Sequence, residues 1–327
     1  MNLTLKDKLL EKLLETTSAP ISGQQLADEF DVSRTAIWKN IKALEEEGYV
    51  IESIRKKGYQ LVEQPDMITA ARLQQYLTAT TYGRNVVHHM ACDSTQFIAH
   101  DLAQQGAEDG TVVITEKQLQ GKGRLARPWA SDNANGLWMS LIMRPDLAPQ
   151  HAPQLTLVAA VSIVRAIEEV CNVRPVIKWP NDILINDLKV TGILTEMQAD
   201  PDRVKSVILG IGMNINQNET DFPTELEDIA TSLKIETGQS FDRAQIAATV
   251  LNYIENYTNL YLEKGFIAIK LLWESYSNTI GRHIRVTMIN EVAEGEAIGI
   301  TADGMLQLKQ HDGTVRNIYS GDITIQS

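Results

Sequence analysis

Cysteine is scarce in this sequence: Cys92 and Cys171 are the only two among 327 residues. They form no CxxC pair, so neither a disulfide framework nor a cysteine-rich zinc site organises the fold. No apolar run approaches the ~18 residues that a membrane span needs. No secretory signal segment is present either. The sequence therefore predicts a protein of the reducing cytoplasm, with no membrane partner.

An excess of positive charge is also missing. Thirty Lys and Arg stand against 42 Asp and Glu, which gives a net charge of −12 and a pI near 5.0. This balance argues against sequence-blind nucleic-acid binding over the whole surface, so any contact with DNA must come from a local patch. The six histidines form no metal-ligand pattern, and we expect no protein-built metal site.

The chain is long enough for two or three domains, and residues 1–65 predict the first, a winged helix-turn-helix. One helix starts at Ser22, and after a tight turn a second starts at Ser33. The runs 49–54 and 59–62 then flank a basic tip, as the two strands of a hairpin wing would.

The second helix and the hairpin tip carry basic and hydrogen-bonding side chains where DNA phosphates and base edges would lie. Residues 1–65 hold nine Lys and Arg against eleven Asp and Glu, so the arrangement of the bases, and not the net charge, favours DNA. The alternative is a winged helix that serves only as a protein interface. The predicted DNA-binding residues are Ser33, Arg34, Thr35, Trp38, Lys39, Lys42, Arg55, Lys56 and Lys57.

A linker at Gln64-Pro65-Asp66 precedes a central α+β domain over residues 66–278. Short connections at Asn186-Asp187 and Asp200-Pro201 require antiparallel neighbours, so the sheet is mixed and not doubly wound. The expected strands are 111–115, 137–143, 176–179, 182–185, 190–197 and 207–214, and the expected helices lie near 69–77, 153–170 and 242–264.

The last segment, 279–327, has apolar residues in steps of two, and Asp303-Gly304 and Asp312-Gly313 are hairpin signals. This pattern predicts a small SH3-like β-barrel. The residues in this alternating pattern are Ile284, Val286, Met288, Ile298, Ile300, Leu306, Leu308, Ile323 and Ile325.

The loop Gly121-Lys-Gly-Arg-Leu-Ala-Arg-Pro-Trp129 gathers three cations and an indole between two apolar runs. Glycines let main-chain N–H groups approach a ligand closely, and arginines fork onto carboxylate or phosphate oxygens. The loop is no Walker A motif, because Arg124 stands where Ser or Thr would hold the metal. By itself, such a short basic glycine loop is usually a solvated surface turn.

Three more segments follow the loop: Lys178-Trp-Pro-Asn-Asp-Ile183, Lys189-Val-Thr-Gly-Ile-Leu-Thr-Glu-Met197 and Gly210-Ile-Gly-Met-Asn214. In this order, the set resembles the biotin protein ligases. With a helix-turn-helix in front, it resembles the bifunctional members, which also repress the biotin operon. The resemblance covers essentially the whole chain, and it implies a central domain similar to class II aminoacyl-tRNA synthetases.

The resemblance implies that the chain uses ATP and Mg²⁺ to form biotinoyl-5′-AMP and transfers biotin to a lysine of a biotin carboxyl carrier domain. It also implies a cytoplasmic protein that, carrying biotinoyl-AMP, forms a homodimer on operator DNA and represses biotin genes. Three alternatives remain: a lipoate ligase on the related fold, a metabolite-sensing repressor with an inactive ligase domain, and a ligase whose winged helix no longer binds DNA.

Adenylation must bring the biotin carboxylate against a triphosphate, and unit charges ~4 Å apart repel by ~4 kcal/mol at an effective dielectric of 20. Arg124, Arg127 and Lys189 are the catalytic candidates to remove this repulsion. Asp182 is the candidate to orient or deprotonate the acceptor lysine in the transfer step. The plain alternatives are an exposed turn lysine for Lys189 and a turn-stabilising carboxylate for Asp182.

Trp129 and Phe222 could sandwich an adenine ring while Asn214 reads its edge; the family also has an adenylate-ordering loop, here 221–232. A hydrophobic anchor is the alternative for Phe222, and a strand-end cap for Ser94 and Thr95. The resemblance places biotin against Ser94, Thr95, Gln96, Gln118, Lys122, Gly123, Arg124, Lys189 and Gly192, and the adenylate against Trp129, Asn214, Phe222 and Ala230.

Lys122 departs from the family loop, which usually has arginine at this place. Lysine keeps the charge but loses the planar fork of the guanidinium. We therefore expect substrate binding to survive and the adenylate to be retained less firmly.

Overall fold

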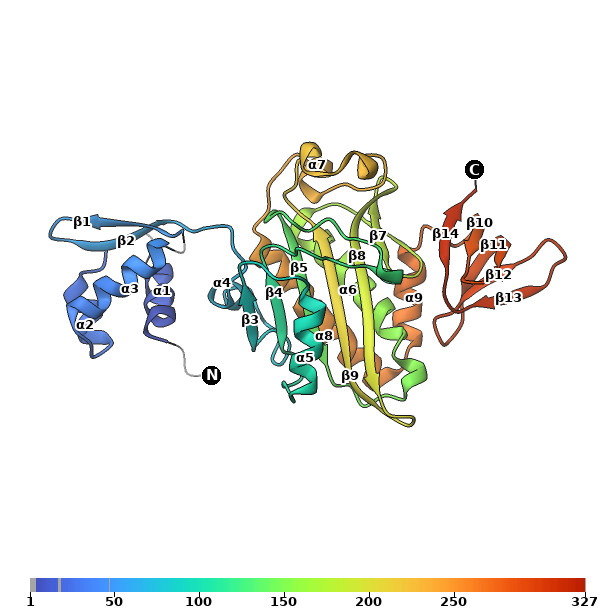
Figure 1. Ribbon diagram of the computed structural model, residues 1–327, viewed down its shortest axis with the longest axis horizontal. Coiled ribbons are helices and arrows are strands. Elements are labelled where there is room, and N and C mark those ends of the chain that lie inside the picture. Colours follow the sequence, from blue (N-terminus) through green and yellow to red (C-terminus); the bar gives the residue numbers. More distant parts are fainter. Residues whose placement is uncertain (1–3, 17–18, 47, 327) are drawn as a thin grey trace. The chain divides into compact units, whose positions relative to one another are not determined.

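The computed structural model describes residues 4–16, 19–46 and 48–326 and divides the chain into two compact units, Met1–Met67 and Ile68–Ser327. The first unit has the predicted winged helix-turn-helix order (Figure 1). Its elements are α1 (Leu5–Glu15), α2 (Gly23–Glu29), α3 (Arg34–Glu46), β1 (Val50–Ile54) and β2 (Gly58–Glu63).

Local sequence explains the turn between α2 and α3. Ser22 Oγ accepts the Gln25 N–H at 3.0 Å and Gln25 Oε1 accepts the Ser22 N–H at 3.1 Å, and this capping box starts the helix predicted at Ser22. Asp31 then takes a left-handed φ of 52°, a conformation that Asp tolerates better than most residues. The turn directs α3 so that its apolar side is buried: Ile37, Ile41 and Leu44 are at most 1% exposed.

The second unit is built on a seven-stranded sheet in the order β3-β4-β5-β9-β8-β7-β6. Only β3 and β4 run parallel among these neighbours, so the predicted mixed sheet is confirmed. The prediction lacked β3. The strands are β3 (Val86–His89), β4 (Val112–Thr115), β5 (Gly136–Met143), β6 (Val176–Lys178), β7 (Asp182–Ile185), β8 (Leu188–Ala199) and β9 (Val204–Asn214).

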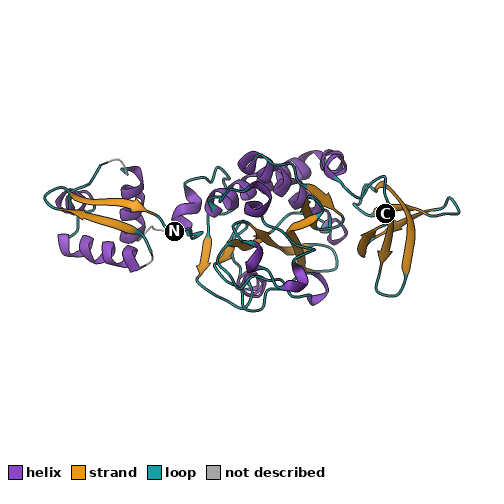
Figure 2. Cartoon of the chain, turned by 90° about the horizontal axis from the view of Figure 1, so that it is seen from above, coloured by secondary structure: helices purple, strands orange, loops and turns teal. Residues whose placement is uncertain are grey.

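Helices cover both faces of this sheet (Figures 1 and 2). Successive strand residues face opposite sides, so Val112 and Ile114 join the core under α6 and α8 while Val113 packs with α5. The short α4 covers less than the predicted 69–77. The helices are α4 (Ala70–Gln74), α5 (Thr95–Gln104), α6 (Gln154–Cys171), α7 (Leu233–Thr237), α8 (Arg243–Lys264) and α9 (Ile267–Tyr276).

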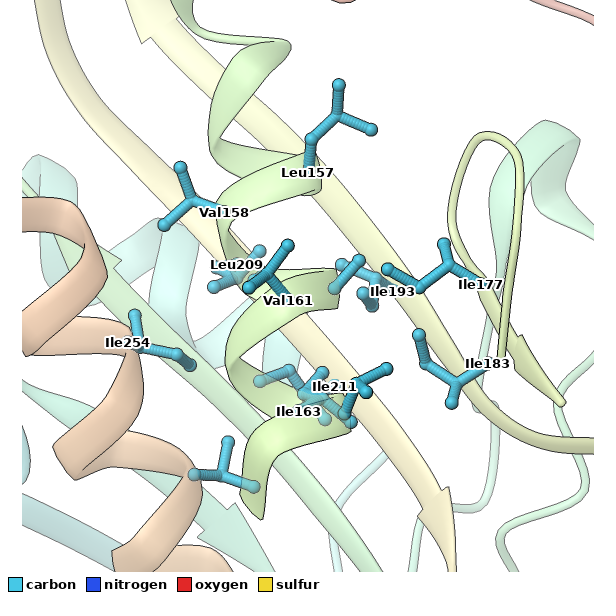
Figure 3. Packing of buried hydrophobic residues seen from close by; sticks show 14 of the residues in the cluster. Leu157, Val158, Val161, Ile163, Ile177, Ile183, Ile193, Leu209, Ile211 and Ile254 are labelled. Atoms are coloured by element: carbon cyan, nitrogen blue, oxygen red, sulfur yellow. The ribbon is translucent and has the colours of Figure 1, made fainter. Parts of the chain in front are cut away.

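Branched aliphatic side chains fill the layer between α6 and the sheet, as Figure 3 shows. Val158 and Val161 of α6 and Leu209 and Ile211 of β9 belong to one buried cluster, and all four are at most 2% exposed. This close packing makes β8 and β9 a rigid platform for side chains on their other face.

The C-terminal segment forms a five-stranded antiparallel sheet in the order β13-β12-β11-β10-β14. The predicted turns at Asp303-Gly304 and Asp312-Gly313 are present between strands. Ile298 departs from the alternating pattern: the register shifts between Ala297 and Gly299, which leaves Ile298 40% exposed. The strands are β10 (His283–Thr287), β11 (Val292–Ile300), β12 (Leu306–Lys309), β13 (Val315–Ile318) and β14 (Asp322–Ile325).

Among the described residues, none of the helices has both the length and the apolar character to cross a membrane.

Candidate active site

A cavity of about 280 Å³ lies where the glycine loop meets α5 and strands β7, β8 and β9. It brings together all the residues predicted to bind biotin or the adenylate and all the catalytic candidates. Its lining includes Ser94, Thr95, Gln96, Gln118, Lys122, Gly123, Arg124, Arg127, Trp129, Asp182, Lys189, Gly192, Asn214, Phe222 and Ala230.

Lys189 and Asp182 form an ion pair on neighbouring strands. Lys189 Nζ lies 2.6 Å from Asp182 Oδ1, and both side chains are about a quarter exposed. The ammonium also lies 5.2 Å from the Trp129 ring centroid, within reach of a cation–π interaction. Lys189 is therefore an ordered cation in the cavity wall, and the alternative of a free turn lysine is wrong.

Arg124 and Arg127 both turn toward the C-terminal domain. Arg124 donates to Asn181 Oδ1 at 3.1 Å and to Ser320 Oγ at 2.8 Å, while Arg127 pairs with Asp322. Burial lowers the pKa of the Arg124 guanidinium, and the nearby carboxylates of Asp322 and Asp182 oppose that shift. Sequence reasoning missed these C-terminal partners because no motif accompanies Ser320 or Asp322.

Lys122 points at the opposite end of the cavity. Its Nζ lies 3.4 Å from Glu196 Oε1 and 4.6 Å from the Phe97 ring centroid. Burial alone would raise the pKa of Glu196, but hydrogen bonds from His100 and Gln96 and the Lys122 charge hold it below its usual range. Lys122 thus starts the loop with a carboxylate partner that the sequence analysis did not identify.

The backbone of the glycine loop differs from the prediction. Positive φ falls on Leu125 (54°) and Ala126 (57°), and neither Gly121 nor Gly123 adopts one. The Gly123 N–H donates to Arg127 O at 2.8 Å, so it is not directed at a ligand. A Cβ on Gly121 would lie 2.2 Å from a serine hydroxyl, and this glycine is needed for close packing.

Polar side chains line the cavity beside α5. Thr95 donates its N–H to Gln118 Oε1 at 3.0 Å, and its hydroxyl lies 2.8 Å from Ser140 Oγ. Ser94 and Thr95 begin α5, so the alternative of a strand-end cap is wrong. Ser140 was missed, although a lone hydroxyl within the apolar run of β5 is a signal that could have revealed it.

The indole of Trp129 lies over two glycines of the central strands. A Cβ would approach the ring to 3.0 Å at Gly192 and to 2.6 Å at Gly212. Gly192 was predicted to lie against biotin, but here the space beside it is taken by the indole. Trp138 meets Trp129 edge to face, with centroids 6.5 Å apart, and this contact fixes the ring at the cavity wall.

The predicted adenylate-ordering loop is attached to the platform through its end. The N–H of Lys189 donates to Ile229 O at 2.8 Å, and the N–H of Thr231 donates to Lys189 O at 2.9 Å. Asn214 Nδ2 donates to Thr231 O at 3.0 Å. Asn214 was predicted to read an adenine edge, and one of its two amide hydrogens is bonded to this loop. Ala230 lies between Ile229 and Thr231, the two loop residues that bond to Lys189.

The predicted DNA-binding residues gather on α3 and on the β1–β2 turn. All nine of them (Ser33, Arg34, Thr35, Trp38, Lys39, Lys42, Arg55, Lys56 and Lys57) are exposed. Trp38, although aromatic, is 50% exposed. An exposed indole surrounded by cations is typical of a binding surface and not of a core.

A winged helix joined to a mixed-sheet domain whose cavity gathers four cations defines a class of protein: a DNA-binding enzyme that handles small anionic substrates. Family models match the described domains in order. They are the HTH domain (residues 6–60), the biotin/lipoate A/B protein ligase family (87–214) and the biotin protein ligase C-terminal domain (279–325).

The chain is 46% identical over 325 residues to the bifunctional ligase/repressor BirA of Bacillus subtilis, in a match that covers 99% of this chain and 100% of that protein. It is 27% identical to the Escherichia coli protein of the same name, over 94% of this chain and 93% of that one. The chain belongs to the family of bifunctional biotin protein ligases and biotin-operon repressors.

Among solved structures, the biotin protein ligase from Aquifex aeolicus in complex with biotin and ATP matches at 30% identity with a TM-score of 0.64. The match covers 74% of this chain and 99% of that chain. The predicted fold class and the ligase–repressor assignment are confirmed. The relatives favour this assignment over the alternative of a lipoate ligase on the related fold.

Proposed function

We propose that this chain condenses biotin with ATP to biotinoyl-5′-AMP in the described cavity and then passes biotin to a lysine of a biotin carboxyl carrier domain. The observation that carries the proposal is the convergence of Lys122, Arg124, Arg127 and Lys189 on one cavity of about 280 Å³. We assign residues 1–65 to the winged helix, residues 66–278 to the catalytic domain and residues 279–327 to the SH3-like C-terminal domain.

Three of the four cations are paired with carboxylates: Lys122 with Glu196, Arg127 with Asp322 and Lys189 with Asp182. Anionic substrates supply replacement partners for Arg127 and Lys189, while Lys122 stays with Glu196, so the biotin carboxylate and the phosphates can enter without leaving a cation unpaired. The positive charges then offset the repulsion between the two substrates and stabilise the charge that develops at the α-phosphate.

Arg124 is the cation best prepared for this role. In the described part of the chain it donates to neutral oxygens of Asn181, Ser320 and Gly321. Its guanidinium fork can therefore donate to a carboxylate or phosphate without first breaking an ion pair. We assign it to the reacting carboxylate and phosphate, with Lys189 beside it.

Mg²⁺ belongs to the nucleotide substrate in this proposal. Within residues 4–16, 19–46 and 48–326, no group of three or more His, Cys, Asp or Glu side chains is placed to hold a metal. The ion therefore enters with ATP, where it neutralises phosphate charge on the leaving pyrophosphate.

The two ends of the cavity suit the two substrates. The hydroxyls and amides at Thr95, Gln96 and Ser140 match the N–H groups and the carbonyl of a ureido ring. Trp129 and Phe222 supply aromatic faces for adenine at the other end. In this proposal the biotin carboxylate lies between these two sets of groups, beside the cations.

Transfer requires a neutral amine, and a free lysine with a pKa of ~10.4 is almost entirely protonated near pH 7. Asp182 lies in the cavity wall and holds the ammonium of Lys189 at 2.6 Å. Once Lys189 turns to the phosphate, Asp182 is free to receive the acceptor lysine in the same way. It then orients the amine and accepts its proton.

The repressor role joins the ligase site to the exposed winged helix. A ligand that orders a dimer surface raises operator affinity by linkage, since two winged helices then engage two half-sites together. The loop 221–232 is the segment we expect biotinoyl-AMP to order.

Cys92 and Cys171 are both unpaired, which supports the predicted cytoplasmic setting.

The test incubates the full chain with MgATP, an apo carrier domain, and either biotin or lipoate. Mass spectrometry should find one biotinoyl group on the carrier and no lipoyl group. A gel shift with operator DNA should appear when biotin and ATP are both present. Lipoylation of the carrier, or no modification, would contradict the proposed ligase reaction, and a shift independent of biotin would contradict the proposed regulation.

A further inference from the structure

Glu196 of β8 receives hydrogen bonds from three sides at the polar end of the cavity. Its Oε2 lies 2.9 Å from Gln96 Nε2 and 3.1 Å from His100 Nε2, and its Oε1 lies 3.4 Å from Lys122 Nζ. An ionised carboxylate only accepts hydrogen bonds, so every one of these neighbours must donate to it. Glu196 therefore fixes the direction of each bond.

The first chain of bonds leads from Glu196 to the cavity wall. Because the amide nitrogen of Gln96 faces Glu196, its Oε1 faces Ser140 and accepts the hydroxyl proton of Ser140 at 2.7 Å. Ser140 Oγ, having donated its only proton, can only accept from Thr95 Oγ1 at 2.8 Å. The direction imposed at Glu196 is thus transmitted to Thr95.

Gln118 Oε1 lies farther from the Thr95 hydroxyl, at 3.3 Å, and already accepts the Thr95 N–H at 3.0 Å, so Ser140 Oγ at 2.8 Å is the closer acceptor of the hydroxyl proton. In either position the proton is used within the protein. The hydroxyl of Thr95, a residue that lines the cavity, then has only lone pairs left for a ligand. The Thr95 hydroxyl, which could otherwise donate to a ligand or accept from it, can therefore only accept.

A second chain of bonds approaches Glu196 from the other side. Ser206 Oγ donates to Gln198 Oε1 at 3.2 Å, and Gln198 Nε2 lies 3.1 Å from His100 Nδ1. An amide nitrogen only donates, so Nδ1 accepts and His100 carries its proton on Nε2, toward Glu196. Two chains of donors therefore end at one carboxylate.

Burial prevents the directions from reversing freely. Thr95 and Gln96 are each 3% exposed and Ser140 is fully buried, so a reversed bond would leave a polar atom unpaired away from water. Packing also restrains the amide, since a Cβ on Gly210 would already lie 2.8 Å from Gln96 Oε1. The chain has one satisfied arrangement as long as Glu196 is a carboxylate.

We propose that Glu196 is a positioning residue that makes Thr95 present an acceptor to the cavity and so selects a ring that donates hydrogen bonds. The inference rests on the proposed function, in which the ureido ring of biotin lies against this wall. A cyclic urea carries two N–H donors and fits such a wall. A ring without N–H groups leaves the Thr95 acceptor unpaired and is disfavoured.

Replacing Glu196 with glutamine tests the inference, because the amide has nearly the same shape but both donates and accepts. For full-length Glu196→Gln we expect the calorimetric Kd for biotin without ATP to rise about tenfold, with the KM for ATP unchanged. Glu291→Gln, which alters an exposed carboxylate of the C-terminal domain paired with Arg316, should leave both constants at the parental values.

Ser140→Ala interrupts the same chain between Gln96 and Thr95 without touching Glu196. Ser140→Ala should also weaken biotin binding. The Kd of the double variant for biotin should be no higher than that of the single variant with the higher Kd, because both changes break one chain. A thermal melt checks that each variant is folded. If Glu196→Gln does not fold, Ser140→Ala still tests the inference.

Parental biotin affinity in folded Glu196→Gln or in Ser140→Ala would overturn the inference, as would additive effects in the double variant. An equal rise of the Kd for biotin and the KM for ATP would also contradict it, because general loosening of the site would explain that result. If the parent itself did not bind biotin, the proposed function would fail first; parental binding with unaffected variants removes this inference alone.

Discussion

Lys122 shows how one side chain changes role with its surroundings. The family loop usually has arginine there, and Lys122 was predicted to lie against biotin. In the structure Lys122 instead lies against Glu196 and the Phe97 ring. A guanidinium can keep both contacts and add a second N–H group to the pair, since its fork matches a carboxylate. Lys122 therefore closes the loop at the polar end of the cavity with fewer bonds than arginine would make.

For Lys122→Arg we expect slower release of biotinoyl-5′-AMP, because the loop is tied to Glu196 through two N–H groups. A reduction of about 3-fold to 10-fold corresponds to one added charge-assisted hydrogen bond of modest strength. Stopped-flow release of preformed adenylate measures it. Lys117→Arg, a charge-preserving change at an exposed position just before the loop, is the control. Release at the parental rate in Lys122→Arg would refute this role.

Asp182 is the second position where a single group decides a step. For Asp182→Asn we expect transfer from preformed adenylate to the carrier lysine to slow about 100-fold or more, since general base catalysis contributes that much. Rapid-quench measurement of a single turnover separates transfer from adenylation. Asp187→Asn alters a nearby exposed turn and should transfer at the parental rate. Parental transfer by Asp182→Asn would leave Asp182 with only its structural pairing to Lys189.

At the scale of elements, the sequence was informative where burial is one-sided or complete. The apolar run at 137–143 and the long pattern at 242–264 predicted β5 and α8 closely, because helix and strand periods differ strongly over such lengths. β3 was missed, since its four residues are all half-buried and give no contrast. The φ values of Leu125 and Ala126 were missed because the contacts around the loop, and not the residue types, impose them.

Glu255 of α8 holds the turn that leads into β3. Its carboxylate accepts the N–H groups of Thr80, Thr81 and Tyr82 at 2.6 to 2.8 Å. Burial would raise the pKa of Glu255, but these backbone bonds outweigh it and lower the pKa from its ordinary 4.5. The carboxylate therefore stabilises the fold above pH 4.5, and this contribution is lost as the pH falls through the lowered pKa.

Glu255→Gln should lower the free energy of unfolding at pH 7 by about 2 kcal/mol, since three backbone N–H groups lose an ionised acceptor. The difference from the parent should shrink as the pH is taken below 4.5. Urea unfolding at several pH values measures both effects. Glu263→Gln, on an exposed turn of the same helix, should be neutral. A pH-independent difference would show that the charge of Glu255 does not matter.

At the scale of the whole molecule, the cavity depends on residues that sequence patterns could not connect. The motifs predicted the cations, the indole and the platform glycines. They did not predict that Asp322 would pair with Arg127 across 195 positions of the chain, or that Ser140 and Glu196 would organise the polar end. Such partners depend on how the C-terminal sheet and β5 pack, which no local pattern encodes.

The winged helix should be separable from the ligase reaction. Replacing Arg55, Lys56 and Lys57 together with alanine removes three exposed cations from the hairpin tip. We expect the slope of log K against log[salt] for operator binding to fall by up to about 3, one for each phosphate that no longer meets a cation. Biotin transfer should stay at the parental rate. Lys8→Ala on α1 is the control, and an unchanged slope in the triple variant would place DNA elsewhere.

The central claim is that cations from separate segments converge to let a carboxylate react with a triphosphate. The most direct measurement is the single-turnover rate of biotinoyl-5′-AMP formation at saturating biotin and MgATP, without an acceptor, for Arg124→Ala and Lys189→Ala beside Arg282→Ala at an exposed position. We predict a loss of about 100-fold to 1,000-fold for each cavity variant and the parental rate for the control. Adenylate formation at the parental rate without Arg124 or Lys189 would contradict the account.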